Sequence, residues 1–293
     1  MEPESKMSSL TVLTQIETNE QWFLGDRIGE GAFSNVYLLT KQNDKTVLIG
    51  KIVNKKNQKA SEFIKKEIEI HKNLKHDNIV EFITSFETIN HYIIVQSYYE
   101  GGNLNNLLRS NINKKLQEYE CQGLFHQILT GLKYLKDQNI VHRDIKPANI
   151  ILKVNQEKAR QSIEDDLDIF IYDVRIGDFG FAIHYLDNDC IKEIGTPNFI
   201  PPELINCDNE SDDNFKIDIW SAGTTFYTCL VGIPPFQTES VKTTYNRILN
   251  CIWNFPEKPF LTAKVKSMVY LMIQLEPNDR SSVEELLTNS FFK

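Results

Sequence analysis

Alternating apolar and polar positions dominate the first hundred residues of the chain. Gln21-Trp22-Phe23-Leu24 opens an alternating stretch, and similar runs follow at Val36-Tyr37-Leu38-Leu39 and Val47-Leu48-Ile49. A period of two residues, rich in β-branched and aromatic side chains, indicates strands with one buried face. Residues 79–86 and 92–96 show the same pattern, so this part of the chain predicts a small antiparallel sheet.

One helix is expected within this strand-rich region, with Ser61 as its cap and its end near Leu74. Phe63, Glu67 and His71 recur every four residues there. Side chains at that spacing share one face of a helix, and we expect His71 to pack inward.

Helical spacing replaces alternation in the second part of the chain. Apolar residues suited to a long buried helix are Leu116, Leu124, Phe125, Ile128, Leu132 and Leu135. Residues 1–18 are expected to form a flexible tail. Polar, acidic composition predicts exposed loops at residues 155–172 and 206–214, and residues 281–288 predict a short amphipathic helical turn.

The composition is that of an ordinary globular protein: 41% of the 293 residues are hydrophobic and 25% are charged. This length allows two lobes with separate cores but little beyond one catalytic unit. The net charge of −8 disfavours nonspecific binding to nucleic acid or anionic membrane, because phosphate groups attract basic surfaces. We therefore expect neither a nucleic-acid partner nor membrane insertion.

The five cysteines are scattered and lack the spacing of disulfide frameworks or metal sites. They predict free thiols in a reducing compartment. Residues 1–6 are polar and acidic, unlike a secretory signal, and no apolar run approaches the length of a membrane span. A cytoplasmic location is expected.

Two short phrases carry the candidate chemistry, His142-Arg143-Asp144-Ile145-Lys146-Pro147-Ala148-Asn149 and Asp178-Phe179-Gly180. The first contains an aspartate that can accept a hydroxyl proton, a lysine that can neutralise phosphate and an asparagine that can bind a metal ion. The second contains an aspartate suited to magnesium between ATP phosphates. Together they predict phosphoryl transfer.

With these phrases the chain resembles the protein kinase superfamily, from about residue 21 to residue 293. The resemblance implies a bilobal α+β fold. Its small β-rich N-lobe, with one regulatory helix, would occupy residues 19–96, and a hinge would follow at residues 97–102. The larger, mainly helical C-lobe would occupy residues 103–293.

The resemblance also implies ATP and Mg²⁺ as cofactors. Gly29-Glu30-Gly31-Ala32-Phe33-Ser34-Asn35-Val36 matches the family's glycine-rich loop except at Ser34, where the third glycine is expected. Ile49 replaces the alanine that commonly covers the adenine, and could crowd the pocket. Gln96 would be the gatekeeper, with the backbone of Ser97 and Tyr99 at the adenine edge. The residues expected to bind ATP are Ile28, Gly29, Glu30, Gly31, Ala32, Phe33, Ser34, Val36, Ile49, Lys51, Gln96, Ser97, Tyr99 and Ile151.

By the same resemblance, Asp144 is the expected proton acceptor and Lys146 steadies the γ-phosphate. Lys51 and Glu67 would pair and hold the α- and β-phosphates. Asn149 and Asp178 are the expected magnesium ligands. Two further matches are an ion pair expected between Glu203 and Arg280, and Asp218-Ile219-Trp220-Ser221-Ala222-Gly223, which matches the helix that anchors the second lobe.

The phrase Gly195-Thr196-Pro197 and the lysine two residues after Asp144 are typical of serine/threonine kinases, so we expect protein serine and threonine acceptors. Between Gly180 and Gly195, Tyr185 is the only residue with a hydroxyl. Arg143 normally implies a phosphate in that segment. We hypothesise that a set of acidic residues mimics it and keeps the segment constitutively ordered; the set is Asp187, Asp189 and Glu193.

Several alternatives stay open. Asp178-Phe179-Gly180-Phe181-Ala182 and the closing Phe291-Phe292 look most like the autophagy-initiating ULK group, with polo and Aurora kinases as competitors. The usual long linker and partner-binding module of ULK kinases are not in this sequence, which puts membership of an autophagy complex in doubt. A pseudokinase scaffold and a small-molecule kinase are the rival functions. Substrate and regulatory partner are not readable.

Overall fold

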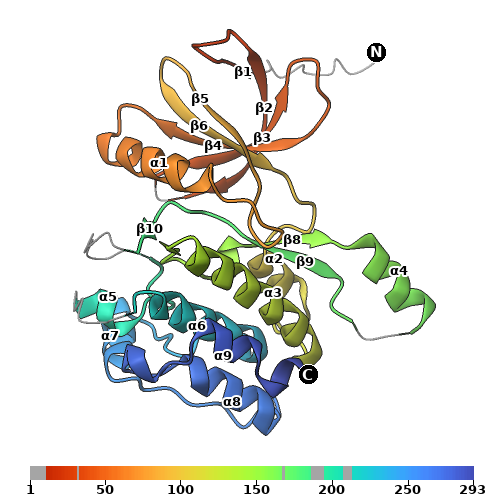
Figure 1. Ribbon diagram of the computed structural model, residues 1–293, viewed down its shortest axis with the longest axis vertical. Coiled ribbons are helices and arrows are strands. Elements are labelled where there is room, and N and C mark those ends of the chain that lie inside the picture. The colour runs from red at the N-terminus through yellow and green to blue at the C-terminus, as the bar shows by residue number, and fades with distance from the viewer. Residues whose placement is uncertain (1–10, 32, 167–168, 186–194, 207–212) are drawn as a thin grey trace, which may run out of the picture. The chain divides into compact units, whose positions relative to one another are not determined.

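A computed structural model describes residues 11–31, 33–166, 169–185, 195–206 and 213–293. Over these residues the chain divides into two compact units (Figure 1). Unit 1 takes in the residues up to Leu74 together with Glu81–Tyr98, and unit 2 takes in Lys75–Val80 and Tyr99–Lys293. Unit 1 is built mainly from strands and unit 2 mainly from helices, which confirms the predicted bilobal α+β fold.

Unit 1 is a six-stranded antiparallel sheet with one helix, α1 (Gln58–His71), on one of its faces. The strand order is β1-β2-β3-β4-β6-β5. The strands are β1 (Thr11–Thr14), β2 (Gln21–Glu30), β3 (Asn35–Lys41), β4 (Leu48–Asn54), β5 (Phe82–Glu87) and β6 (His91–Ser97). The predicted small antiparallel sheet is confirmed.

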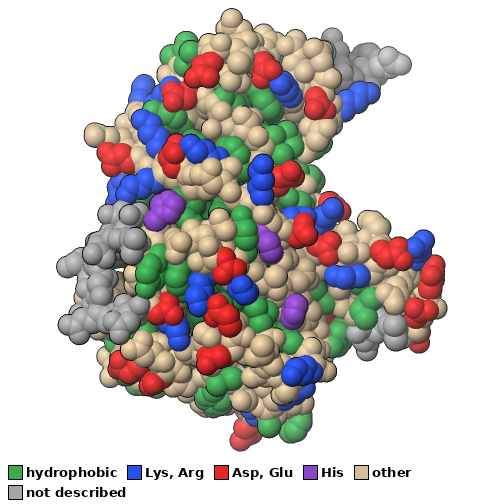
Figure 2. Space-filling model, viewed as in Figure 1, with side chains coloured by type: hydrophobic (Ala, Val, Ile, Leu, Met, Phe, Trp, Pro, Cys, Tyr) green, Lys and Arg blue, Asp and Glu red, His purple; other side chains and the backbone are tan. Residues whose placement is uncertain are grey.

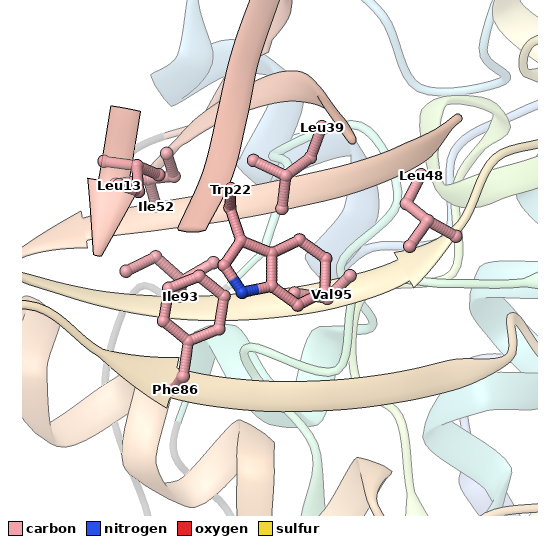
Figure 3. Packing of buried hydrophobic residues seen from close by; sticks show 8 residues of the cluster. All are labelled: Leu13, Trp22, Leu39, Leu48, Ile52, Phe86, Ile93 and Val95. Atoms are coloured by element: carbon pink, nitrogen blue, oxygen red, sulfur yellow. The ribbon is translucent and has the colours of Figure 1, made fainter. Parts of the chain in front are cut away.

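The face of the sheet opposite α1 is covered by a core of eight buried residues (Figure 3). Its centre is the stack of Trp22 on Phe86, with ring centroids 5.3 Å apart. Leu48 and Ile52 of β4 point into this core, so Lys51 must point to the other face because side chains alternate along a strand. The remaining members are Leu13, Leu39, Ile93 and Val95.

The expectation of a flexible tail over residues 1–18 is wrong for Thr11–Thr14, which pairs with β2. Leu13 lies opposite Trp22 in this pairing and is buried with it. A strand of four residues gives too short an alternation to be recognised in sequence, and its stability comes from the apolar contact. Residues 1–10 lie outside the described residues.

Helix α1 begins earlier than predicted, because Asn57 and not Ser61 caps it. The Asn57 side-chain oxygen accepts the Ala60 N–H at 3.0 Å, whereas the Ser61 hydroxyl donates to the Asn57 carbonyl at 2.9 Å. An asparagine side chain that satisfies an otherwise unpaired amide fixes the start of a helix. The helix ends at His71, and His71 is fully buried as expected.

The strand expected over residues 79–86 starts only at Phe82. Ile79 belongs to unit 2, where it forms an isolated parallel bridge with Ile176. The apolar run therefore serves two different sheets, which periodicity alone cannot reveal.

Unit 2 is built around two long helices, α3 (Glu118–Asp137) and α6 (Lys216–Val231). Phe125 and Phe226 stack between them with ring centroids 4.2 Å apart. The other helices are α2 (Leu104–Ser110), α4 (Gln156–Glu164), α5 (Pro202–Asn206), α7 (Val241–Leu249), α8 (Ala263–Met272), α9 (Val283–Leu287) and the 3-10 turns Pro147–Asn149, Pro277–Asp279 and Ser290–Phe292. Two small antiparallel sheets complete the unit, β8 (Ile150–Val154) with β9 (Tyr172–Ile176) and β7 (Ile140–Val141) with β10 (Ile183–His184).

The expected exposed loop at residues 155–172 contains the helix α4. The Asn155 side chain caps it by accepting the Lys158 N–H at 3.0 Å, and it also donates to Asp173. None of the residues of α4 is buried, and charged side chains of both signs surround it (Figure 2). The exposure was predicted, but the helix was not.

Two sequence predictions about the whole chain are met where the structure allows a test. Over the described residues, no helix is long and apolar enough to cross a membrane. Cys121, Cys229 and Cys251 are free thiols, as predicted. Cys190, Cys207 and most of the expected loop at residues 206–214 lie outside the described residues.

Candidate active site

In unit 1 the glycine-rich loop is the turn of the β2–β3 hairpin. Glu30 pairs with Asn35, and the Gly31 N–H donates to the Ser34 carbonyl at 2.8 Å. Phe33 leaves this turn to stack on Phe63 of α1, with centroids 5.2 Å apart. Ala32 lies outside the described residues.

The hairpin does not itself need glycine at Gly29 or Gly31. Neither has the positive φ that disfavours other residues. A Cβ added at Gly29 would meet only Val36 at 3.5 Å, and one at Gly31 would meet the small Ser34 hydroxyl at 3.2 Å. By contrast, a Cβ at Gly101 would lie 2.4 Å from the Leu152 carbonyl, so packing explains that glycine. The bare backbone of the loop therefore suits close approach by a ligand such as phosphate.

Lys51 and Glu67 form the predicted ion pair on the α1 face of the sheet. The Lys51 ammonium donates to both Glu67 carboxylate oxygens, at 2.8 and 2.7 Å. The side chains are 13% and 2% exposed, so this pair is shielded from water and fixed in direction. A bidentate, buried carboxylate leaves the ammonium one remaining side for a further anion.

Ile49 and Gln96 lie opposite each other across β4 and β6, on the same face as Lys51. Ile49 is half-buried, while Gln96 is buried and hydrogen-bonded through its side chain to His71 at 3.2 Å. The Ser97 N–H donates to the Glu81 carbonyl at 3.1 Å. These positions are consistent with a row of residues along one sheet face.

The remaining residues expected at the nucleotide are placed as follows. Ile28 is 47% exposed on β2, and Val36 is half-buried on β3, opposite Lys51. In unit 2, Tyr99 is buried beneath the Arg175 guanidinium, 4.9 Å from its ring centre, and Ile151 lies on β8 opposite Arg175. The structure fixes these residues within their own units.

In unit 2 the predicted catalytic residues Asp144, Lys146 and Asn149 form one cluster. Lys146 Nζ lies 2.7 Å from Asp144 Oδ2, and Asn149 Nδ2 donates to the same oxygen at 2.8 Å. Asn149 Nδ2 also donates to the Asp144 carbonyl at 2.8 Å. With both amide hydrogens used, Asn149 can offer only its side-chain oxygen to a ligand.

Asp144 is 4% exposed, and its Oδ1 atom is buried without a hydrogen-bond partner among the described residues. Burial raises the pKa of Asp144 above its ordinary value, against the opposing effect of Lys146. A buried carboxylate oxygen without a partner is costly in a folded protein, so its persistence indicates a functional position. It is the kind of atom that can accept a proton from a bound hydroxyl.

Asp218 of α6 holds the backbone that presents Asp144. Its two carboxylate oxygens accept the N–H groups of His142 and Arg143, both at 2.8 Å. Arg143 has a positive φ of 63°, an unfavourable conformation that these bonds stabilise. Burial raises the pKa of Asp218, while the neighbouring His142 and the two backbone donors oppose the shift.

His142 and Phe179 act through packing, as expected. His142 is fully buried, its Nδ1 accepts the Asp144 N–H at 3.2 Å, and Nε2 must then donate to the Gly177 carbonyl at 3.0 Å. Burial lowers the pKa of His142, which fits this neutral form. Phe179 packs edge-on against the His142 ring, with centroids 5.1 Å apart.

Asp178 is brought next to Asn149 by the backbone, since the Gly177 N–H donates to the Asn149 carbonyl at 2.9 Å. Its side chain is exposed on a backbone with φ of 63°, and one of its oxygens accepts the Gly180 N–H at 3.3 Å. A carboxylate and an amide oxygen form the hard donor set that Mg²⁺ prefers, completed by phosphates and water. Among the described residues no group of three or more His, Cys, Asp or Glu side chains could bind a metal ion by itself. The two residues therefore fit magnesium that arrives with a nucleotide.

Sequence reasoning missed two partners in this cluster. Thr196 accepts a hydrogen bond from Lys146 at 2.7 Å, and Asp218 carries the loop as described above. Both lie in motifs visible in the sequence, yet the motif does not say which atom each side chain meets. Arg143 donates through Nε to the Phe181 carbonyl at 2.7 Å, and its hypothesised acidic partners lie in 186–194, outside the described residues.

The expected ion pair between Glu203 and Arg280 is present. Arg280 donates to the two Glu203 oxygens at 2.6 and 2.8 Å and is fully buried. The guanidinium also lies 4.9 Å from the centre of the Trp220 ring. It ties α5 to the segment after α8, 77 residues later in the chain.

Comparisons with known proteins agree with this geometry. The protein kinase domain family matches residues 22–292. The "Probable serine/threonine-protein kinase CCRP1" of Zea mays is 35% identical over 94% of this chain and 42% of its own length. The "Serine/threonine-protein kinase polo" of Drosophila melanogaster is 36% identical over 90% of this chain and 43% of its own length. A third relative, the "Probable serine/threonine-protein kinase PLK" of Dictyostelium discoideum, is 33% identical over 92% of this chain and 26% of its own length.

The chain belongs to the protein kinase domain family. Its relatives are serine/threonine-protein kinases, and the chain spans 26 to 43% of the length of these three. The match covers both units, including every element that carries a predicted site residue.

Proposed function

We propose that this chain is a serine/threonine protein kinase that transfers the γ-phosphoryl group of Mg·ATP to protein hydroxyls. The observation that carries the proposal is the Asp144 carboxylate. One of its oxygens is held by Lys146 and Asn149, and the other is buried without a partner among the described residues. Such a group is fixed in direction and ready to accept a substrate hydroxyl.

In the proposed reaction, Asp144 Oδ1 orients the acceptor hydroxyl and takes its proton as the new O–P bond forms and the bond to the ADP oxygen breaks. Lys146 neutralises charge on the transferred group, and Thr196 keeps its ammonium in place. Asn149 and Asp178 would hold magnesium, which supplies charge neutralisation on the phosphates. Positioning and charge do most of the catalysis in this class of reaction.

Unit 1 would contribute the nucleotide side. The Lys51 ammonium, directed by Glu67, would bind the α- and β-phosphates, and the backbone of Gly29 and Gly31 would approach the phosphates closely. Ile49, Gln96, Ser97, Tyr99 and Ile151 remain the proposed adenine contacts. Ile49 is larger than the alanine of relatives, so we expect weaker ATP affinity and not a loss of binding.

Serine and threonine acceptors are supported by the Lys146–Thr196 hydrogen bond and by the names of the relatives. Polo among these names favours the polo competitor over the ULK group. The ULK-type autophagy role stays a prediction that nothing tests so far. A cytoplasmic location and a regulatory partner are likewise predictions.

The rival proposal is a pseudokinase that binds nucleotide or partners without efficient transfer. Its support is Ile49 and the unusual segment after Gly180. Against it stands the catalytic set Lys51, Glu67, Asp144 and Lys146, in which each side chain meets the partner that the chemistry needs. A small-molecule kinase is disfavoured by the peptide-positioning phrase at Gly195-Thr196-Pro197.

The test is phosphate transfer from labelled Mg·ATP by unphosphorylated, bacterially expressed protein. The acceptors are serine/threonine peptides, tyrosine peptides and free small alcohols, side by side. We expect labelling of serine and threonine peptides only. Labelling of the alcohols would favour the small-molecule kinase, and ATP binding without any labelling would favour the pseudokinase.

A further inference from the structure

Helix α1 does more than supply Glu67. Phe63, Glu67 and His71 lie four residues apart on the helix and each contacts a different residue of the proposed nucleotide site, all within unit 1. Phe63 contacts Phe33, Glu67 contacts Lys51, and His71 contacts Gln96. We call these three helix residues the α1 stripe.

The first contact of the α1 stripe reaches the glycine-rich loop. The rings of Phe33 and Phe63 are nearly parallel, with an angle of 13° and centroids 5.2 Å apart. Lys59, one turn before Phe63, places its ammonium 5.7 Å from the Phe33 ring centre. Phe33 also packs on the buried cluster beneath α1. The tip of the loop is therefore attached to the helix and does not extend into solvent.

The last contact of the α1 stripe reaches the other end of the row of predicted ATP residues. The His71 ring is fully buried, shares a hydrogen bond of 3.2 Å with the buried Gln96 side chain, and packs edge-on against Phe82 at 5.5 Å. Two polar links thus join α1 to adjacent strands, Glu67 to β4 and His71 to β6. Two separated links prevent the helix from pivoting about either one.

We propose that Phe63 and His71 are positioning residues, which with Glu67 make α1 a single alignment element for the loop, the lysine and the gatekeeper. The inference rests on the proposed function of the same site. The α1 stripe spans about 12 Å along the helix, since each residue rises about 1.5 Å. Any shift of α1 therefore displaces all three nucleotide-site residues together.

The alignment uses contacts internal to unit 1 alone. The segment between Gly180 and Gly195 contains no serine or threonine that could carry an activating phosphate. A helix fixed by its own sheet and loop provides an ordered nucleotide site without that modification. The α1 stripe thus accounts for a kinase that is active as synthesised.

The test measures the dissociation constant of Mg·ATP by calorimetry, which does not require transfer, for wild type, F33L, F63L and the double variant. Leucine keeps apolar volume and removes the ring stack. We expect each single variant to weaken binding about two- to tenfold, because aromatic pairs contribute that much beyond burial. The double variant should bind about as weakly as either single variant.

Phe86→Leu is the matched control, since Phe86 stacks on Trp22 on the opposite face of the same sheet. It should lower the melting temperature without changing ATP affinity. His71→Leu with Gln96→Leu gives a second cycle, in which the combined loss of affinity should again be less than the product of the single losses.

Unchanged affinity in F63L, or losses that multiply in the F33L/F63L pair, would overturn the inference while leaving the proposed function intact. A similar loss in F86L would overturn it as well, because the effect would then be general destabilisation. Wild-type protein that neither binds nor transfers from ATP would refute the proposed function itself, and the inference with it.

Discussion

At the scale of single residues, Asp144 and Asp218 divide two tasks between two buried carboxylates. Asp144 keeps one oxygen without a partner among the described residues, whereas both oxygens of Asp218 accept backbone N–H groups. The first arrangement leaves a group available for chemistry, and the second holds strained backbone in place. Identical side chains thus take different roles because their hydrogen bonds differ.

Replacing Asp218 tests this division. Asp218→Ala leaves the His142 and Arg143 N–H groups buried without acceptors, and each is expected to cost about 1–3 kcal/mol of unfolding free energy. Asp218→Asn keeps one acceptor oxygen and should lose less. Chemical denaturation measures both; an alanine variant as stable as wild type would show that these bonds do not hold the loop.

The residues with a chemical role could be predicted from motifs, since phosphoryl transfer requires a small set of side chains in fixed order. Lys51–Glu67 and Glu203–Arg280 were predicted as pairs and are present. Thr196 and the His71–Gln96 contact could not be predicted in this way. Each depends on which side chains the tertiary fold brings within hydrogen-bonding distance.

At the scale of elements, α1 and α4 offer a comparison. Both start at an asparagine whose side chain accepts an N–H three residues later, Asn57 for α1 and Asn155 for α4. Helix α1 buries six residues and carries Glu67, whereas α4 buries none and carries no proposed site residue. The same local signal therefore serves a functional helix and a peripheral one.

Removal of either cap should separate stability from function. Asn57→Ala and Asn155→Ala should each cost about 1 kcal/mol of helix stability. Only Asn57→Ala should weaken Mg·ATP binding, because only α1 aligns nucleotide-site residues. Calorimetry on both variants decides: equal effects on affinity would mean that α1 has no special part in binding.

Errors in predicting elements came from short or polar segments. The strand β1 has four residues and depends on Leu13 meeting Trp22, and α4 lacks a buried face that would give it a helical pattern. Strong periodicity in long elements was sufficient for the main sheet and for α3. Boundaries were missed where a cap three residues upstream took precedence, as at Asn57 and Ser61.

At the scale of the whole molecule, each unit has its own core and its own share of the proposed site. Unit 1 holds the loop, Lys51 and Glu67, and unit 2 holds Asp144, Lys146, Asn149 and Asp178. The family match runs through both units, over residues 22–292. The account therefore depends on both units serving one reaction, with the proton acceptor at Asp144.

The most direct measurement is the turnover number for one serine peptide, compared between wild type and Asp144→Asn at saturating Mg·ATP. Asparagine keeps the shape but cannot accept the proton, so we predict a fall of about 10²–10⁴-fold, with the affinity for Mg·ATP little changed. An Asp144→Asn variant that turns over as fast as wild type would contradict the central claim.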